Sequence, residues 1–98
     1  MVLLVAAMML AQIGLPFAIE LKSGPGTGYQ WQLAAIPEGI ELLGSEYQPA
    51  PDAQIGDPAT QVFRLRASKA GRYSLRFLLK RTWENESIRE TVVDVDVK

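Results

Sequence analysis

Three runs of this sequence contain the residues that could do chemistry or recognition: 23–28, 48–60 and 81–86. The 98 residues include no cysteine and no histidine, which excludes disulfides, thiol nucleophiles, Cys/His zinc sites and imidazole-based triads. An enzyme would depend on carboxylates, Lys or Tyr alone. Thr27, Tyr29 and Asp57 could cluster, but nothing beside them supplies a base with a tuned pKa. We therefore expect no enzyme, no metal and no cofactor.

The first run, Ser23-Gly24-Pro25-Gly26-Thr27-Gly28, leads directly into Tyr29. Glycines here allow a tight backbone path and let another surface approach closely. A phosphate-binding loop would need a following helix and a GKS/T signature, and both are missing, so a turn between two strands is favoured. Trp31 is in phase with Leu33 and is expected in the core, as is the tryptophan on the third strand of many sandwiches.

The other two runs also look like exposed connections. Trp83 follows a strand end and lies among polar residues, so its indole either folds back over the core or is presented to a partner. Both alternatives stay open. The run Gln48–Thr60 carries prolines at 49, 51 and 58. It is long for a compact sandwich, and such a loop is either functional or mobile.

Charge argues against a nucleic-acid partner. Ten Lys and Arg against eleven Asp and Glu give a net charge of −1. A cationic stretch does run over 64–81, but its arginines occupy the outward positions of two expected strands. If strand 72–80 pairs antiparallel with strand 88–97, Arg72 and Arg76 come within reach of the acids there, which are Glu90, Asp94 and Asp96. We expect these charges to pair within the domain.

The elements that must hold these runs are strands. Apolar and polar residues alternate with period two over 17–22, 29–33, 63–66, 72–80 and 91–97, and breakers separate these segments. Ile40 to Tyr47 is a less regular strand and is expected at an edge. The spacing predicts an all-β fold, an immunoglobulin-like β-sandwich of about seven antiparallel strands. The length predicts one domain over 1–98.

The beginning of the chain has two interpretations. Residues 2 to 11 are all apolar, which is too short for a bilayer span. They could form a secretory signal core, although a charged segment before them is missing. They could instead form a first strand buried on both faces, which we favour.

The motifs of this chain resemble a known family. Gly24-Pro25-Gly26-Thr27-Gly28-Tyr29-Gln30-Trp31 is similar to the NPTTGYxW motif of the chagasin family, which inhibits papain-like cysteine peptidases. The stretch Gln61 to Leu75, with its Lys69-Ala70-Gly71 turn, resembles the family's VFxFxA…KAGxxxL segment. Arg81-Thr82-Trp83-Glu84 resembles its RPWE motif. Order and spacing agree over about residues 13 to 98, and the fold implied is again an immunoglobulin-like sandwich.

The resemblance implies a reversible, non-covalent inhibitor that inserts three loops into the cleft of a papain-like cysteine peptidase. Its partner would be that peptidase, and the inhibitor would act as a monomer, with an extracytoplasmic location favoured over a cytoplasmic one. The residues carried over from the three family loops are Pro25, Gly26, Thr27, Gly28, Tyr29, Gly56, Asp57, Pro58, Ala59, Arg81, Thr82 and Trp83.

This sequence departs from the family pattern in each loop. Gly24 stands for the motif's asparagine, Gly26 for its first threonine, and Thr82 for the proline before the tryptophan. Only Gly56 remains of a GxGG pattern, and Pro58 removes a backbone donor there. The alternative from another class is a non-inhibitory immunoglobulin-like binding or structural module, which has no reason to place a TGY turn and an RxW turn at the same end.

Overall fold

A computed structural model describes residues 7–23, 28–49 and 59–98. It confirms the expected all-β fold, with seven strands. The described residues contain no helix that is long and apolar enough to cross a membrane. The strands are β1 (Ala7–Ala11), β2 (Phe17–Ser23), β3 (Tyr29–Leu33), β4 (Ile40–Pro49), β5 (Ala59–Ala67), β6 (Gly71–Arg81) and β7 (Arg89–Val97).

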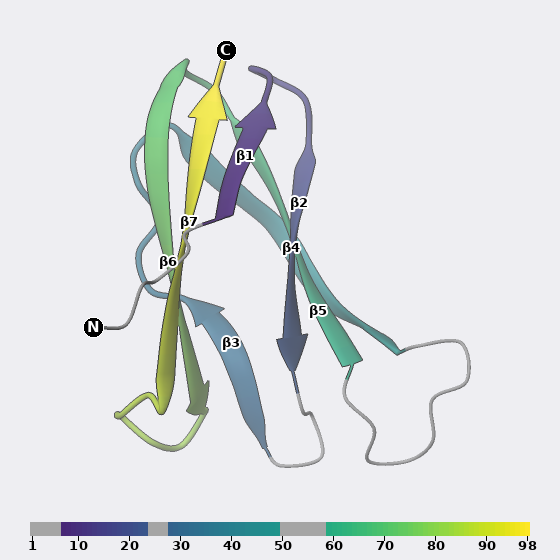
Figure 1. The fold of residues 1–98 in the computed structure, drawn as a ribbon, viewed down its shortest axis with the longest axis vertical. Helices are drawn as coiled ribbons and strands as arrows, with labels where there is room; N and C mark the ends of the chain where they lie inside the picture. Colours follow the sequence, from purple (N-terminus) through teal and green to yellow (C-terminus); the bar gives the residue numbers. More distant parts are fainter. Residues whose placement is uncertain (1–6, 24–27, 50–58) are drawn as a thin grey trace.

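The strands form two sheets that pack as a sandwich (Figure 1). One sheet has the order β1-β7-β6-β3 and the other has the order β2-β5-β4. The pairs β2–β5, β4–β5, β3–β6 and β6–β7 are antiparallel, as the alternation predicts. The prediction that every strand is antiparallel is wrong for β1, which pairs with β7 in parallel. Alternation reveals which face a side chain occupies, but it carries no information on the direction of the neighbouring strand.

The N-terminal strand also differs from the expectation that both of its faces are buried. Within the apolar segment 2–11 the structure has a strand over Ala7–Ala11, and residues 1–6 lie outside the described part. Ala11 is buried, whereas Met8 and Leu10 are 55% and 74% exposed. The reason is that β1 is an edge strand and that, among the described residues, no element packs on the outer face of its sheet. The domain boundaries and the signal-sequence alternative stay predictions.

The core lies between the two sheets and is built from the inward positions of β5, β6 and β7. Leu65, Leu75, Phe77 and Val95 are completely buried. The rings of Phe63 and Phe77 meet across the sheets with their centroids 4.9 Å apart. Each large apolar side chain buried here contributes about 1.5–3 kcal/mol, so this layer fixes how the strand ends are placed.

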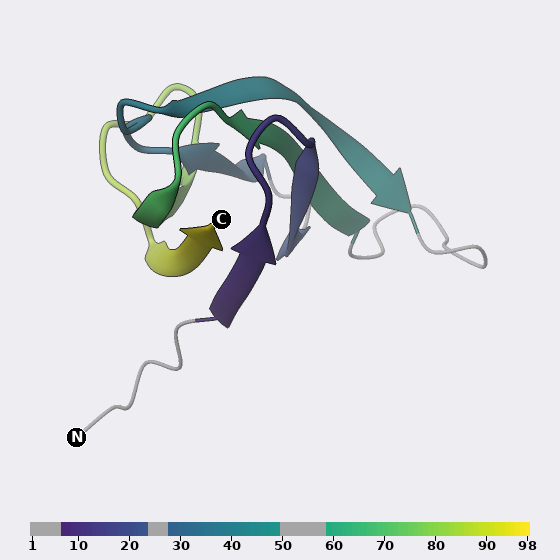
Figure 2. The same cartoon turned by 90° about the horizontal axis from the view of Figure 1, so that it is seen from above.

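Strand β4 is the edge strand that the sequence predicts. It pairs only with β5, and its register shifts between Leu42 and Gly44, where a bulge interrupts the ladder. Its side chains over 41–48 are exposed, and Figure 2 shows it passing along the outside of the sandwich. A bulge at an edge strand blunts pairing with another chain.

Several cations of the 64–81 stretch pair within the domain, as expected for Arg76, whereas no ion pair of Arg72 with its register partner Asp96 is present among the described residues. Arg64 and Arg66 contact acids of β4, and their partners are Glu46 at 2.6 Å and Glu41 at 2.7 Å. On the other sheet, Arg76 donates two hydrogen bonds to the Glu90 carboxylate, Nε to Oε1 at 2.6 Å and Nη2 to Oε2 at 3.0 Å. These hydrogen bonds hold the pKa of Glu90 below its usual value.

Candidate functional site

Three connections join strands at one end of the sandwich, which we call the loop end (Figure 1). They are the β2–β3, β4–β5 and β6–β7 connections. The ladders bring their flanking residues together, because Ala59 pairs with both Ser23 and Pro49, while Tyr29 pairs with Arg81. The motifs that are distant in sequence therefore begin and end at the same end of the fold.

The structure describes half of the predicted site residues. Gly28, Tyr29, Ala59, Arg81, Thr82 and Trp83 are described, whereas Pro25, Gly26, Thr27, Gly56, Asp57 and Pro58 lie outside the described residues. Ala59 is the first residue of β5 and is buried, so it lies at the base of its connection. The loop expected over Gln48–Thr60 is shorter than predicted, because β4 continues to Pro49 and β5 begins at Ala59.

Arg81 joins two of these connections. Its guanidinium carbon lies 4.3 Å from the centroid of the Tyr29 ring and 5.8 Å from that of the Trp83 ring. Its Nη1 lies 3.5 Å from Oε1 of Glu84, whose backbone N–H donates to the Arg81 carbonyl at 3.1 Å. A guanidinium is attracted to the negative face of an aromatic ring, so the cation is held by two rings and a carboxylate.

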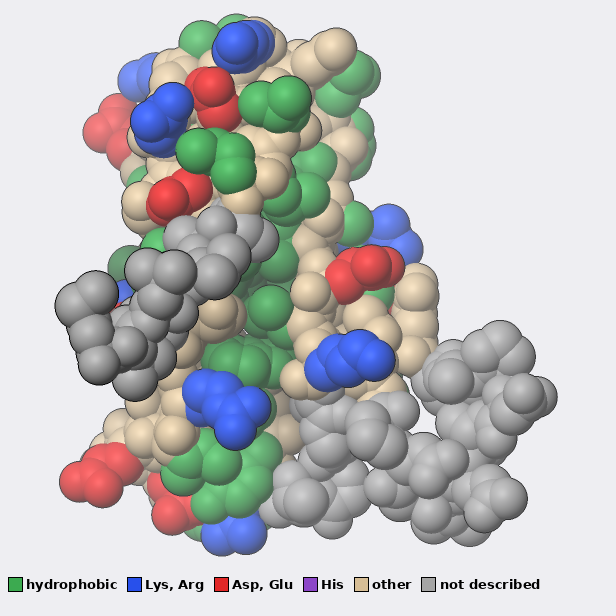
Figure 3. Space-filling view, in the orientation of Figure 1, with side chains coloured by type: hydrophobic (Ala, Val, Ile, Leu, Met, Phe, Trp, Pro, Cys, Tyr) green, Lys and Arg blue, Asp and Glu red, His purple; other side chains and the backbone are tan. Residues whose placement is uncertain are grey.

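Trp83 is presented outward, which answers the question that its sequence context left open. Its side chain is 71% exposed. Ile88, in the same connection, is 61% exposed and was missed by the sequence analysis, although an isoleucine after Asn85-Glu86-Ser87 is a signal of the same kind. Figure 3 shows hydrophobic side chains exposed at the loop end, where β6 ends. An aromatic ring exposed beside an arginine is typical of a binding surface.

Gly28 shows why the β2–β3 connection ends in glycine. Its φ of +83° lies in the left-handed region, which L side chains rarely adopt. A Cβ built at this position would lie 2.9 Å from Cη2 of Trp83. The tryptophan therefore packs directly on the glycine, and any larger residue would displace the indole.

The base of the β2–β3 connection is fixed by Trp31 and Gln61. Trp31 is 6% exposed, as predicted, and its indole N–H donates to the Lys22 carbonyl at 2.8 Å. Gln61 is buried and was not predicted. Its amide accepts from the Trp31 N–H and donates to the Trp31 carbonyl, both at 2.8 Å. Because β3 is an edge strand, no further strand pairs with its outer backbone groups at Trp31. The Gln61 side chain makes those hydrogen bonds instead and so links β3 to β5 of the other sheet.

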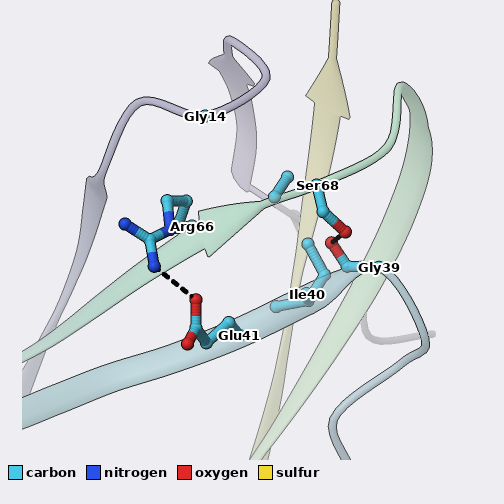
Figure 4. A pocket seen from close by; sticks show the side chains of 7 residues that line it. Gly14, Gly39, Ile40, Glu41, Arg66 and Ser68 are labelled. Carbon is cyan, nitrogen blue, oxygen red and sulfur yellow. Dashed lines mark hydrogen bonds and ion pairs between the residues drawn. The ribbon is translucent and has the colours of Figure 1, made fainter.

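The opposite end of the sandwich carries a cavity of about 370 Å³ (Figure 4). It is lined by residues from the β1–β2 and β3–β4 connections, from the start of β4, and from the end of β5 and the residue that follows it. Its polar side chains already have partners, because Arg66 pairs with Glu41 and the Ser68 hydroxyl lies 3.4 Å from the Gly39 carbonyl. In the described residues no group of three His, Cys, Asp or Glu side chains could hold a metal.

Comparison with known families and proteins agrees with the motifs. Residues 11–97 match the model of the family described as "Chagasin family peptidase inhibitor I42". Amoebiasin-2 of Entamoeba histolytica is 25% identical over 84 residues, which cover 82% of this chain and 68% of that protein.

Solved structures share the fold. The cysteine protease inhibitor EhICP2 from Entamoeba histolytica superposes with a TM-score of 0.76 at 23% identity, covering 95% of this chain and 87% of that one. The ICP of Leishmania mexicana gives a TM-score of 0.62 at 20% identity, covering 95% and 90%. At these identities the likeness supports the sandwich architecture.

Proposed function

Because this chain belongs to the chagasin family of peptidase inhibitors, we propose that it inhibits papain-like cysteine peptidases by inserting its loop end into the active-site cleft. The inhibition is reversible and non-covalent, and one monomer binds one peptidase. The β2–β3 connection faces the catalytic cysteine. The other two connections contact the walls of the cleft. The chain's own lack of cysteine and histidine fits this role, since the reactive pair belongs to the partner.

The observation that supports this proposal best is the cluster at the loop end. Tyr29 at the start of β3 and Trp83 in the β6–β7 connection both contact Arg81, and Trp83 is 71% exposed. A cluster whose side chains are already held in place before binding, as those of Tyr29, Arg81 and Trp83 are, loses little ordering entropy when the complex forms. Peptidase–inhibitor interfaces bury about 800 Å² per partner, an area that three such connections can supply.

The residues outside the described part are proposed from their sequence alone. Pro25, Gly26 and Thr27 would lie against the catalytic centre, where glycine lets the backbone approach closely. Gly56, Asp57 and Pro58 would contact a cleft wall. Pro58 has no N–H to donate, so this contact would rely on side chains and carbonyls more than a GxGG loop does.

Titration of the purified protein against papain and a cathepsin-L-like peptidase tests the proposal. We expect stoichiometric, reversible loss of peptidase activity at nanomolar concentrations, with one inhibitor bound per active site. The inhibitor should be recovered uncleaved. No loss of activity up to tens of micromolar on several such peptidases would contradict the proposal and favour a non-inhibitory module.

Trp83→Ala locates the binding surface within the fold. We expect it to weaken inhibition by about 2 kcal/mol, which is roughly thirtyfold, because a large exposed aromatic ring at the centre of an interface behaves as a hot spot. Ile13→Ala is the matched control, since Ile13 is an exposed apolar residue of the β1–β2 connection at the opposite end. The loop end would not be the binding surface if the control lost inhibition, or if Trp83→Ala changed the binding free energy by less than about 0.5 kcal/mol.

A further inference from the structure

We propose that Arg81 is a positioning residue that clips the β2–β3 and β6–β7 connections into one preformed unit. It does so by contacting Tyr29 and Trp83 at the same time, and its own contact with the peptidase is secondary. The effect on inhibition rests on the proposed function, whereas the clip itself is a property of the free protein. We call Tyr29, Arg81, Trp83 and Glu84 the Arg81 clip.

The clip continues the core at the point where the core reaches solvent. Tyr29 and Arg81 are register partners on adjacent antiparallel strands, so their side chains share one face of the sheet. Phe77 and Leu79 precede Arg81 at two-residue spacing on the same face, and they belong to the core or pack against it. At the last position of β6 this row of apolar side chains is followed by Arg81, whose guanidinium carbon lies 4.3 Å from the Tyr29 ring centroid.

Arginine suits this position better than lysine. The planar guanidinium can lie against an aromatic ring and still direct N–H groups sideways to an acceptor, whereas the lysine ammonium is a compact and strongly hydrated charge. Here Nη1 lies 3.5 Å from Glu84, and the Glu84 N–H closes a turn back to the Arg81 carbonyl. The side chain therefore holds the start of the β6–β7 connection as well as the ring of Tyr29.

The contact between Trp83 and Gly28 completes the link between the two connections. The Trp83 ring packs at 2.9 Å from the position that a Gly28 Cβ would occupy. The guanidinium carbon of Arg81 lies 5.8 Å from the centroid of the same ring. If Arg81 is removed, the exposed indole loses the group that orients it toward Gly28, and the two connections move independently. Such loosening raises the ordering cost of binding without removing a direct contact.

The first test needs no peptidase. We expect the ring current of Trp83 to displace a Gly28 Hα proton from the ordinary glycine position in the ¹H NMR spectrum, because a Cβ at Gly28 would lie only 2.9 Å from Cη2 of that ring. We expect Arg81→Ala to return that resonance toward the ordinary position. Arg72→Ala, an arginine on the same strand at the opposite end, should leave it in place. An unchanged Gly28 resonance in Arg81→Ala would overturn the clip.

The second test measures inhibition constants in a double-mutant cycle. We expect Arg81→Ala to weaken inhibition about tenfold, mostly through faster dissociation, but less than about threefold when Trp83 is already alanine. Arg81→Lys should restore only part of the loss, because an ammonium does not stack on a ring as the guanidinium does. A second tenfold loss in the Trp83→Ala background, or full rescue by lysine, would identify Arg81 as an independent charged contact and overturn the proposal.

The two tests separate the failure of the clip from the failure of the proposed function. If the unmodified protein inhibits no papain-like peptidase, the proposed function fails, and the NMR comparison still decides whether Arg81 holds the two connections. If inhibition is strong and the Gly28 resonance is the same in Arg81→Ala as in the unmodified protein, the proposed function stands and the clip fails.

Discussion

Removing the buried amide of Gln61 should destabilise the whole loop end. In Gln61→Leu the backbone N–H and carbonyl of Trp31 lose the side-chain amide that pairs with both of them, and Trp31 is 6% exposed, so water does not replace that amide freely. Each unsatisfied backbone group lowers the unfolding free energy by about 1–3 kcal/mol, and burial of the leucine side chain offsets part of that loss. We expect a net loss of about 3 kcal/mol of unfolding free energy. For a domain of this size that lowers Tm by about 12–24 °C.

Urea denaturation and thermal melting measure this loss. Gln32→Leu is the matched control, because Gln32 lies beside Trp31 on β3, is half-buried, and in the described part of the fold makes no side-chain hydrogen bond to the other sheet. We expect the control to change the unfolding free energy by less than about 0.5 kcal/mol. A loss of that small size in Gln61→Leu itself would refute the argument that this amide replaces a missing strand.

A second variant separates the two hydrogen bonds. In Gln61→Glu the ionised carboxylate still accepts from the Trp31 N–H but cannot donate to the Trp31 carbonyl. Burial raises the pKa of a carboxyl group, so this variant should be least stable at neutral pH and should recover toward the unmodified protein as the pH falls and the acid becomes a donor. A deficit that is constant from pH 7 to pH 4 would contradict the assignment of donor and acceptor.

Two further changes test other parts of the fold. Gly28→Ala should lose about 1 kcal/mol of stability from its left-handed φ and weaken inhibition by displacing Trp83, whereas Gly44→Ala, with no atom within 4 Å of its added Cβ, should change neither property. An NMR titration should give Glu90 a pKa below that of an ordinary glutamate, because the Arg76 hydrogen bonds favour the carboxylate. The ion pair's stabilisation is then present above the ordinary glutamate pKa and lost as the pH falls through the lowered pKa. Arg76→Gln should raise the pKa of Glu90, and a Glu90 pKa that is the same in this variant and in the unmodified protein would contradict the pairing.

Most of the fold could be predicted from sequence because its strands follow a strict period of two. The alternation of Tyr73, Leu75 and Phe77 with polar residues gives both the strand and its buried face, and the structure agrees. The burial of Trp31 follows from its phase with Leu33 in the same way. Exposure of one face to water enforces this periodicity, so it is readable without the structure.

The remaining features depend on partners that the sequence does not identify. Gln61 is in phase with Phe63 and Leu65, and a polar residue at an inward position signals a buried hydrogen bond, but only the fold reveals that Trp31 is the partner. The parallel pairing of β1 follows from its position beside β7, and the sequence does not show which strand will be its neighbour. The exposure of Trp83 depends on how Gly28 and Arg81 pack around it.

The separation of the two ends of the sandwich has a practical consequence. Lys98 lies at the end opposite the three connections, where its N–H donates to the Ala11 carbonyl and its carbonyl accepts from Ile13 (Figure 1). A flexible tether, a fluorophore or a second domain fused after Lys98 would extend away from the loop end. Immobilised in this way on a sensor or resin, the protein would leave its loop end open to the surrounding solution.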